Sequence, residues 1–281
     1  MVRNIELFIK ACEKLHIPYE TFHSSQSLMR IKLDKYYYYF VNNGTPFNSE
    51  AINELFKDKE YTYLLLKDKI NTPWCLGFLS PFCPEEYKQY LVYQNLAEIT
   101  EEVTKHFALP VIVKKNRGFG GNNVFLAKTV EDIGDAFSAI FDVNSKKVDY
   151  VALAQEYIDI IHEYRVIVYQ NEILLVYEKD KSHATFTGNI SPLHWDGAIA
   201  LHITDEAVIR EIQDFIEPIF SEIMINYAGF DIARDGDGKL WLIEINGTPN
   251  YNIFIRDNGE DIIVTMFQTI LSRFRDLQKG C

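Results

Sequence analysis

Three oxygen-bearing side chains in the C-terminal third of the chain have the spacing of a cation site. Glu244 and Asn246 are two residues apart in the apolar run KLWLIEIN, so on a β-strand they share one face. If GFDIARD pairs with this strand across the turn at 236–238, Asp231 projects from the same sheet face. Carboxylate and amide oxygens are hard ligands suited to Mg²⁺. A salt-bridged structural cluster is the alternative, because a buried carboxylate needs a partner.

A glycine-rich segment, RGFGGNN, lies between two predicted strands. Gly120 and Gly121 let the backbone approach phosphate oxygens without a Cβ in the way. Lys114 is one of two consecutive lysines before the segment, and on an alternating strand one of the two points inward. Because Asn123 stands where a dinucleotide fingerprint has its last glycine and no Gly-Lys-Ser/Thr follows, neither that fingerprint nor a P-loop fits. A tight hairpin and a solvated basic pair are the structural alternatives.

The elements that must position these groups follow from hydrophobic periodicity and from cap and turn signals. The predicted helices span 3–16, 49–56, 59–69, 85–107, 129–141, 205–224 and 258–275. The predicted hairpins are 29–41, one around Gln170-Asn171 and one around 236–238, with buried strands at LPVIVKK and VALAQEY. This mixture indicates an α+β fold.

Composition excludes several classes of protein. With 281 residues, 47% of them hydrophobic and 24% charged, the chain fits a folded globular protein. The formal net charge of −12 disfavours a nucleic-acid binder. No apolar run reaches the roughly 18 residues of a membrane span and the start lacks a signal-like segment, so we expect no membrane partner and a cytoplasmic location. The four cysteines lack metal or disulfide spacing and are expected to be free thiols.

Four segments, in their order along the chain, resemble the ATP-grasp superfamily over roughly residues 58 to 255. They are DKEYTYLLLKDKINTP, VIVKKNRGFGGNNV, AQEYIDIIHEYRV and GFDIARDGDGKLWLIEINGTPNYN. The resemblance is to the branch with RimK-type glutamate ligases, lysine-biosynthesis ligases and D-alanine:D-alanine ligase. It implies two α/β-type lobes that grip ATP, a lid lobe (59–155) and a C-terminal lobe (156–281), preceded by a short N-terminal segment (1–58).

The resemblance also implies roles for individual residues. The implied phosphate-contacting residues are Lys59, Lys114, Gly120 and Gly121. The implied adenine and ribose contacts are Glu156, Tyr157, Ile158 and Glu163. The implied ligands of Mg²⁺, or of Mn²⁺ in its place, are Asp231, Glu244 and Asn246. The residues expected to steady the transferred phosphate or the carboxylate are Arg165 and Lys179. The residues expected to shape the acceptor site are Asn189, His194 and Trp195.

The activity implied by the resemblance is ATP-dependent joining of a carboxylate to an amine through an acyl phosphate, with release of ADP and phosphate. Small-molecule substrates are expected, one of them an amino acid or a peptide, and a homodimer is the assembly considered. An ATP-binding protein without ligase activity, a kinase and an acid-thiol ligase are the alternatives on the same fold.

Overall fold

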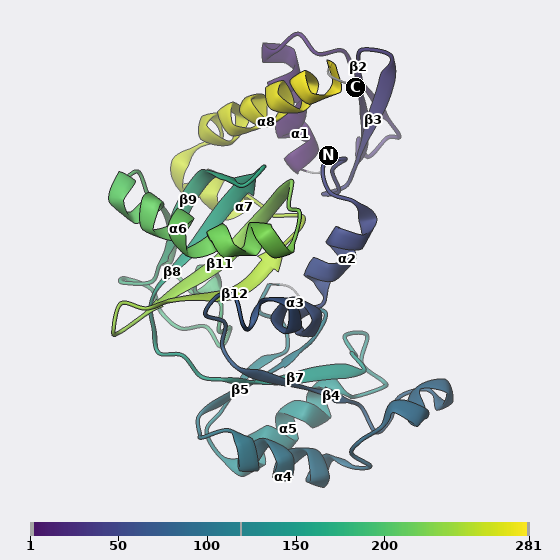
Figure 1. The fold of residues 1–281 in the computed structure, drawn as a ribbon, viewed down its shortest axis with the longest axis vertical. Helices are drawn as coiled ribbons and strands as arrows, with labels where there is room; N and C mark the ends of the chain where they lie inside the picture. Colours follow the sequence, from purple (N-terminus) through teal and green to yellow (C-terminus); the bar gives the residue numbers. More distant parts are fainter. Residues whose placement is uncertain (1–2, 119, 280–281) are drawn as a thin grey trace.

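The computed structural model describes residues 3–118 and 120–279, which form three antiparallel β-sheets with helices packed between and around them (Figure 1). The N-terminal part holds α1 (Arg3–Lys14), then β1 (Tyr19–Phe22), β2 (Leu28–Leu33) and β3 (Tyr36–Val41) in the order β1-β2-β3. The predicted 29–41 hairpin is therefore confirmed, with its turn at Asp34-Lys35. α2 (Glu50–Lys57) follows, capped by Ser49 as predicted.

A four-stranded sheet in the order β4-β7-β5-β6 carries the glycine-rich segment. Its strands are β4 (Cys75–Leu79), β5 (Val111–Lys115), β6 (Val124–Ala127) and β7 (Val151–Glu156), and α3 (Lys59–Leu66) precedes them. α4 (Leu96–His106) and α5 (Val130–Ile140) cover the face that points away from the rest of the molecule (Figure 1). Apolar side chains of both helices and of the sheet form a separate core.

The prediction of one long helix over 85–107 is wrong. A short 3₁₀ helix, η1 (Glu85–Tyr90), is separated from α4 by residues 91–95. The side chain of Asn95 caps α4 by accepting a hydrogen bond from the backbone N–H of Glu98 (3.0 Å), and Glu98 in turn accepts one from Gln94 N (2.7 Å). This N-cap starts a new helix where the apolar spacing alone suggested continuation.

The central sheet has five antiparallel strands in the order β10-β9-β8-β11-β12. They are β8 (Ile160–Tyr169), β9 (Glu172–Asp180), β10 (Ile199–His202), β11 (Tyr227–Asp235) and β12 (Leu240–Asn246). The two hairpins predicted from the sequence, β8–β9 and β11–β12, are both confirmed. A 3₁₀ turn, η2 (Pro192–His194), lies in the connection between β9 and β10.

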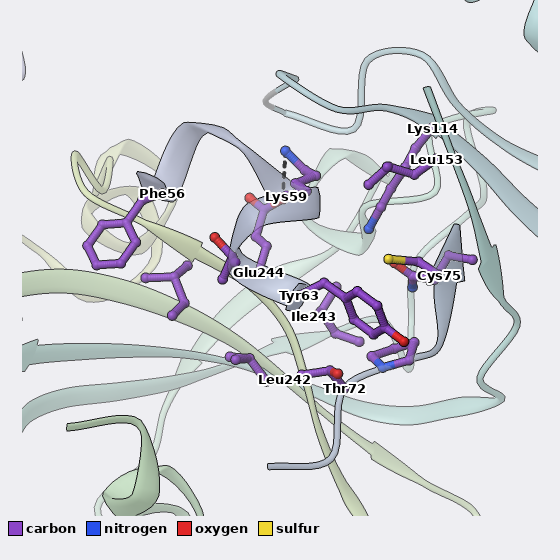
Figure 2. Close-up of a pocket in the computed structure, with 14 residues that line it drawn as sticks. Phe56, Lys59, Tyr63, Thr72, Cys75, Lys114, Leu153, Leu242, Ile243 and Glu244 are labelled. Atoms are coloured by element: carbon purple, nitrogen blue, oxygen red, sulfur yellow. Dashed lines mark ion pairs between the residues drawn. The ribbon is translucent and has the colours of Figure 1, made fainter. Parts of the chain in front are cut away.

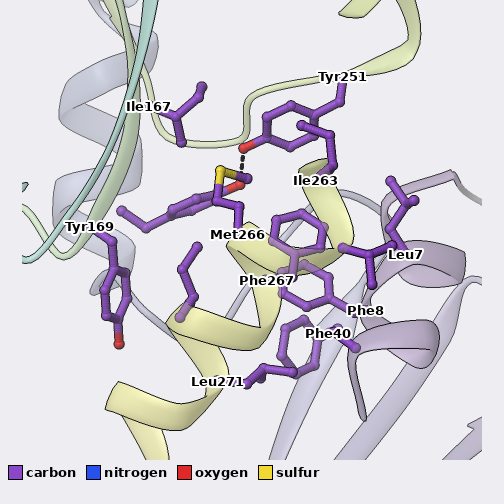
Figure 3. Packing of buried hydrophobic residues seen from close by; sticks show 14 of the residues in the cluster. Leu7, Phe8, Phe40, Ile167, Tyr169, Tyr251, Ile263, Met266, Phe267 and Leu271 are labelled. Carbon is purple, nitrogen blue, oxygen red and sulfur yellow. Dashed lines mark hydrogen bonds between the residues drawn. The ribbon is translucent and has the colours of Figure 1, made fainter. Parts of the chain in front are cut away.

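Alternation along the central strands assigns each residue to one of two covered faces. Val166, Val168 and Phe230 pack with α6 (Glu206–Glu222), whereas Ile167 and Tyr227 pack with α1 and α8 (Asp261–Lys279) on the other face (Figure 3). The same alternation places Arg165 of β8, Lys179 of β9 and Asp231 of β11 on the α8 side, beyond the end of its apolar cluster. The site described below occupies this end of the sheet.

The predicted helix at 258–275 corresponds to α8, and a further helix that was not predicted, α7 (Asn252–Asn258), precedes it. Gly259, with φ +79°, ends α7 in a conformation that L-residues with a Cβ rarely adopt. Cys12, Cys75 and Cys83 are free thiols, as expected, whereas Cys281 lies outside the described residues. Within 3–118 and 120–279, no helix is long and apolar enough to cross a membrane. The lobe boundaries proposed from the sequence stay a prediction.

Candidate functional site

The β11–β12 hairpin brings three oxygen-bearing side chains together. Asp231 lies opposite Glu244 in the strand register, and Gly229 lies opposite Asn246. Asn246 Nδ2 donates to Glu244 Oε1 (2.8 Å) and approaches Asp231 Oδ2 (3.4 Å). The convergence expected from the residue spacing is therefore present, and the role of the three as metal ligands stays a prediction.

Two buried cations contact Asp231 directly, and the sequence did not indicate this. Arg165 grips the carboxylate with two hydrogen bonds, Nε to Oδ1 (2.8 Å) and Nη2 to Oδ2 (3.0 Å). Lys179 Nζ lies 2.8 Å from Asp231 Oδ1 and also pairs with Glu163. Burial alone would lower the pKa of both cations, but the carboxylates beside them outweigh burial and raise each pKa above its usual value.

Lys59 is positioned by the start of α3. Asp58 caps this helix by accepting from the backbone N–H of Tyr61 (3.0 Å), and the backbone N–H of Glu60 donates to the side chain of Asn116 at the end of β5 (3.0 Å). The helix start is thereby held beside the four-stranded sheet. Lys59 Nζ donates to the backbone oxygen of Gly118 (2.7 Å) and lies 3.4 Å from Glu244 Oε2, so it links the glycine-rich segment to the central sheet.

Lys114 points from β5 into the gap between the two sheets, beside Cys75, while the Lys59–Glu244 ion pair lies across the gap (Figure 2). It is 6% exposed, and no hydrogen bond or ion pair to its amine is present in the described part of the chain. Burial, followed by the nearby charge of Lys59, lowers the pKa of Lys114 to about 8. Burial would raise the pKa of Glu244, but Lys59, the Asn246 hydrogen bond and Lys114 together hold that pKa at about 2.

These lysines line a small pocket between the four-stranded sheet and β12, with room for about 30 Å³. Such a volume holds one or two water molecules. Apolar side chains make most of its wall, and the polar side chains facing it include Thr72 and Gln155. Gln155 is buried and Thr72 Oγ1 has no hydrogen-bond partner within the described residues. Sequence analysis identified neither residue. Alternation along β7, which turns Gln155 to the face opposite Glu156, is the signal that could have indicated Gln155.

The predicted adenine and ribose contacts are not among the residues that line this pocket. Glu156 Oε1 accepts from the backbone N–H of Trp74 (2.6 Å), Tyr157 is 42% exposed, and Ile158 is half-buried. Glu163 is engaged by Lys179. The structure thus gathers the phosphate and metal candidates closely and leaves the predicted adenine contacts outside the pocket lining.

The glycine-rich segment contacts the connection between β9 and β10. Gly120 and Gly121 have φ of +65° and +68°, in the left-handed region that favours glycine. Asn189 Nδ2 donates to the backbone oxygen of Gly120 (3.1 Å), and Trp195 Nε1 donates to the backbone oxygen of Asn189 (2.6 Å). His194 lies next to Trp195 in the same connection, and Phe119 lies outside the described residues. The predicted acceptor residues therefore lie against the predicted phosphate loop.

The donor set suits a hard divalent cation, since it offers two carboxylates and an amide oxygen on one sheet face. Residues 3–118 and 120–279 contain no group of three or more His, Cys, Asp or Glu side chains arranged to hold a metal. Here the third oxygen comes from Asn246.

Several proteins of known structure are similar to this chain in fold. The chain is 19% identical to the ATP-grasp ligase PsnB complexed with a minimal precursor, with a TM-score of 0.52. The match covers 82% of this chain and 65% of PsnB. It is 17% identical to D-alanine–D-alanine ligase from Bacillus anthracis, with a TM-score of 0.53, and the match covers 80% of this chain and 69% of the ligase. It is 14% identical to a bifunctional glutathione synthetase from Pasteurella multocida, with a TM-score of 0.52, and the match covers 96% of this chain and 44% of the synthetase.

At these identities the likeness shows the fold, which is the ATP-grasp fold. The chain spans less than two thirds of the length of PsnB and less than half that of the glutathione synthetase. No curated protein matches the sequence. Residues 83–270, about two thirds of the chain, match the RimK-like ATP-grasp domain. The chain belongs to the RimK-like ATP-grasp family.

Proposed function

We propose that the protein is an ATP- and Mg²⁺-dependent carboxylate–amine ligase that works through an acyl phosphate. The observation that carries the proposal is the convergence of Lys59 and Lys114 on a gap whose other wall bears Glu244, next to Asp231 and Asn246. A group of this composition matches what phosphoryl transfer needs, which is cations aimed at phosphate oxygens and oxygen ligands for a divalent metal.

In this proposal the nucleotide base enters the pocket between the four-stranded sheet and β12, and its phosphates extend toward the two lysines. The pocket has too little room for a base as it stands, so the four-stranded sheet must move away from β12 to admit one. The Lys59–Glu244 ion pair (3.4 Å) spans the two sides and has to break or shift during that opening. Closure afterwards excludes water, which would hydrolyse an acyl phosphate.

The reaction has two steps. A carboxylate oxygen of the substrate attacks the γ-phosphorus, the bond from phosphorus to the β,γ-bridging oxygen breaks, and ADP leaves. The amine nitrogen then attacks the acyl carbon, phosphate departs with the carboxylate oxygen, and the nitrogen loses a proton. A metal ion held by Asp231, Glu244 and Asn246 would neutralise charge on the phosphates. Lys114, which has no partner of its own among the described residues, is available for the transferred phosphate.

The acceptor is proposed to bind beside the 181–197 connection, where Asn189, His194 and Trp195 lie near the glycine-rich segment. Amino acids and peptides are the substrates to try first, because the similar structures include a D-alanine–D-alanine ligase, a glutathione synthetase and a ligase with a peptide precursor. Whether Mn²⁺ replaces Mg²⁺ belongs to the same experiment.

The test is an ADP-release screen of amino acids and dipeptides, singly and in pairs, followed by mass measurement of any product. If the protein is a ligase, ADP forms only when a carboxylate and an amine that it accepts are both present. The mass of the product is then lower by one water than the sum of the two substrates. Addition of hydroxylamine should convert the activated carboxylate into a hydroxamate. A phosphorylated product that is stable to hydroxylamine would show that the protein is a kinase and not a ligase of this kind. A thioester product would show that it is an acid-thiol ligase.

A further inference from the structure

The carboxylate of Asp231 is fully engaged by protein cations. Arg165 occupies both of its oxygens, and Lys179 Nζ lies 2.8 Å from Oδ1. The side chains of Lys179 and Asp231 are 4% and 7% exposed, so water screens this contact very little. A cation that approaches Asp231 therefore has to compete with two buried positive charges.

The charges around the site have the wrong sign to attract a free metal ion. The four cationic side chains are Lys59, Lys114, Arg165 and Lys179, and the three carboxylates that face them are Glu163, Asp231 and Glu244. The cations outnumber the carboxylates by one. A nucleotide triphosphate, with several negative charges, reverses this balance when it enters.

Lys179 differs from Arg165 in having a second carboxylate partner. It pairs with Glu163 on β8 as well as with Asp231 on β11, because β9, β8 and β11 are neighbours in the sheet. A buried charge that loses its only partner is strongly destabilised. Lys179 can release Asp231 and still be paired, since Glu163 remains.

We propose that Lys179 is a positioning residue that occupies Asp231 in the nucleotide-free protein, so that the divalent cation binds together with the nucleotide and not before it. The proposal rests on the metal site of the proposed function and adds an order of binding to it. In this scheme Glu163 holds Lys179 after the exchange, and the phosphates take over the charge balance of the site.

The test is Mn²⁺ binding followed by electron paramagnetic resonance, which reads the free ion and needs no turnover. After subtraction of the Mn²⁺ that the analogue chelates in a protein-free sample, wild-type protein should bind Mn²⁺ alone at least about tenfold more weakly than in the presence of a non-hydrolysable ATP analogue. Lys179→Gln should strengthen the binding of Mn²⁺ alone by about tenfold. Lys69→Gln is the matched control, because Lys69 pairs with Glu222 on the surface (2.6 Å) and should leave both affinities unchanged.

A second variant has the opposite predicted sign. Glu163→Gln leaves Lys179 with Asp231 as its only carboxylate partner, so Mn²⁺ binding in the presence of the analogue should weaken by about tenfold. A merely structural role of Lys179 would not strengthen metal binding in one variant and weaken it in the other. If Lys179→Gln is poorly stable, Mn²⁺ alone should raise its melting temperature and leave that of the wild type unchanged.

The outcomes separate this proposal from the proposed function. Equal wild-type affinity for Mn²⁺ with and without the analogue, or unchanged affinity in Lys179→Gln, overturns the order of binding and leaves the metal site intact. Absence of Mn²⁺ binding even with the analogue overturns the metal site itself.

Discussion

Replacing Lys114 with methionine should make the nucleotide-free protein more stable at neutral pH while weakening its hold on ATP. Lys114 is 6% exposed and has a pKa of about 8, against 10.5 for an ordinary lysine. Because the folded-state pKa is the lower of the two, the unfolded chain holds more protons between these values, and stability rises with pH across that window. Methionine fills a similar volume without a charge.

The size of the effect follows from the shift. A lowering from 10.5 to about 8 corresponds to about 3 kcal/mol of cost for the charged lysine in the folded state, and this cost is fully present below pH 8. Lys114→Met should therefore gain about 3 kcal/mol at pH 7, about 2 kcal/mol at pH 9 and less than about 1 kcal/mol at pH 10.

Urea unfolding of both proteins at these three pH values measures the difference directly. Binding of an ATP analogue, measured by calorimetry on the same samples, should be weaker in the variant at pH 7. A stability difference that does not change with pH, or a variant less stable than the wild type throughout, would refute the reasoning. Burial of the charged Lys114 would then not destabilise the folded protein, and the reasoning that it is retained to bind a ligand would fail.

Three further predictions concern the same site. Glu244→Ala should abolish Mg²⁺-dependent ADP formation while the circular dichroism spectrum stays that of the wild type, and unchanged turnover in a folded variant would remove Glu244 from the metal site. Gly121→Ala should raise KM for ATP, since a Cβ there would lie 2.1 Å from Asn189 Oδ1 at a φ of +68°; Gly134→Ala in α5, whose Cβ would meet only a side-chain oxygen at 3.7 Å, is the control and should leave KM unchanged. The value of kcat/KM for ATP should fall as pH rises through about 8, because free Lys114 loses its proton there, and Lys114→Arg should remove that fall.

Local signals were enough for the parts of the fold in which neighbours in sequence are neighbours in space. The turn at 236–238 fixes the β11–β12 hairpin, and with it the approach of Asp231, Glu244 and Asn246. Ser49 and Thr129 cap α2 and α5 as the sequence predicts, and Thr129 forms a full capping box with Asp132. Each of these features is decided within one short stretch of the chain.

The charged partners of Asp231 could not be predicted in this way. Arg165 is 66 residues away in sequence and meets Asp231 only because β8 pairs with β11 in one register, which no local pattern specifies. A one-residue slip in that pairing would turn Arg165 to the other face of the sheet. The resemblance indicated a role for Arg165 and Lys179 at the transferred phosphate but not that both contact a predicted metal ligand.

The error over 85–107 has a local cause that the sequence did contain. Asn95 and Glu98 have the spacing of a capping box, which marks the start of a helix, but the apolar residues on both sides continued the helical period. The cap determines where α4 begins because it supplies hydrogen-bond partners for the backbone N–H groups at the start of the helix. Hydrophobic spacing alone carries no information about those groups.

The most direct test of carboxylate activation follows the fate of an oxygen atom. A substrate pair found in the ADP-release screen is supplied with ¹⁸O in both carboxylate oxygens, and the phosphate released by the wild-type protein is measured by mass spectrometry. An acyl-phosphate intermediate predicts one ¹⁸O atom in each phosphate, because that oxygen leaves with phosphorus when the amine attacks. Unlabelled phosphate released alongside the amide product would contradict the account, because the labelled oxygen lost from the carboxylate would then have left by another route.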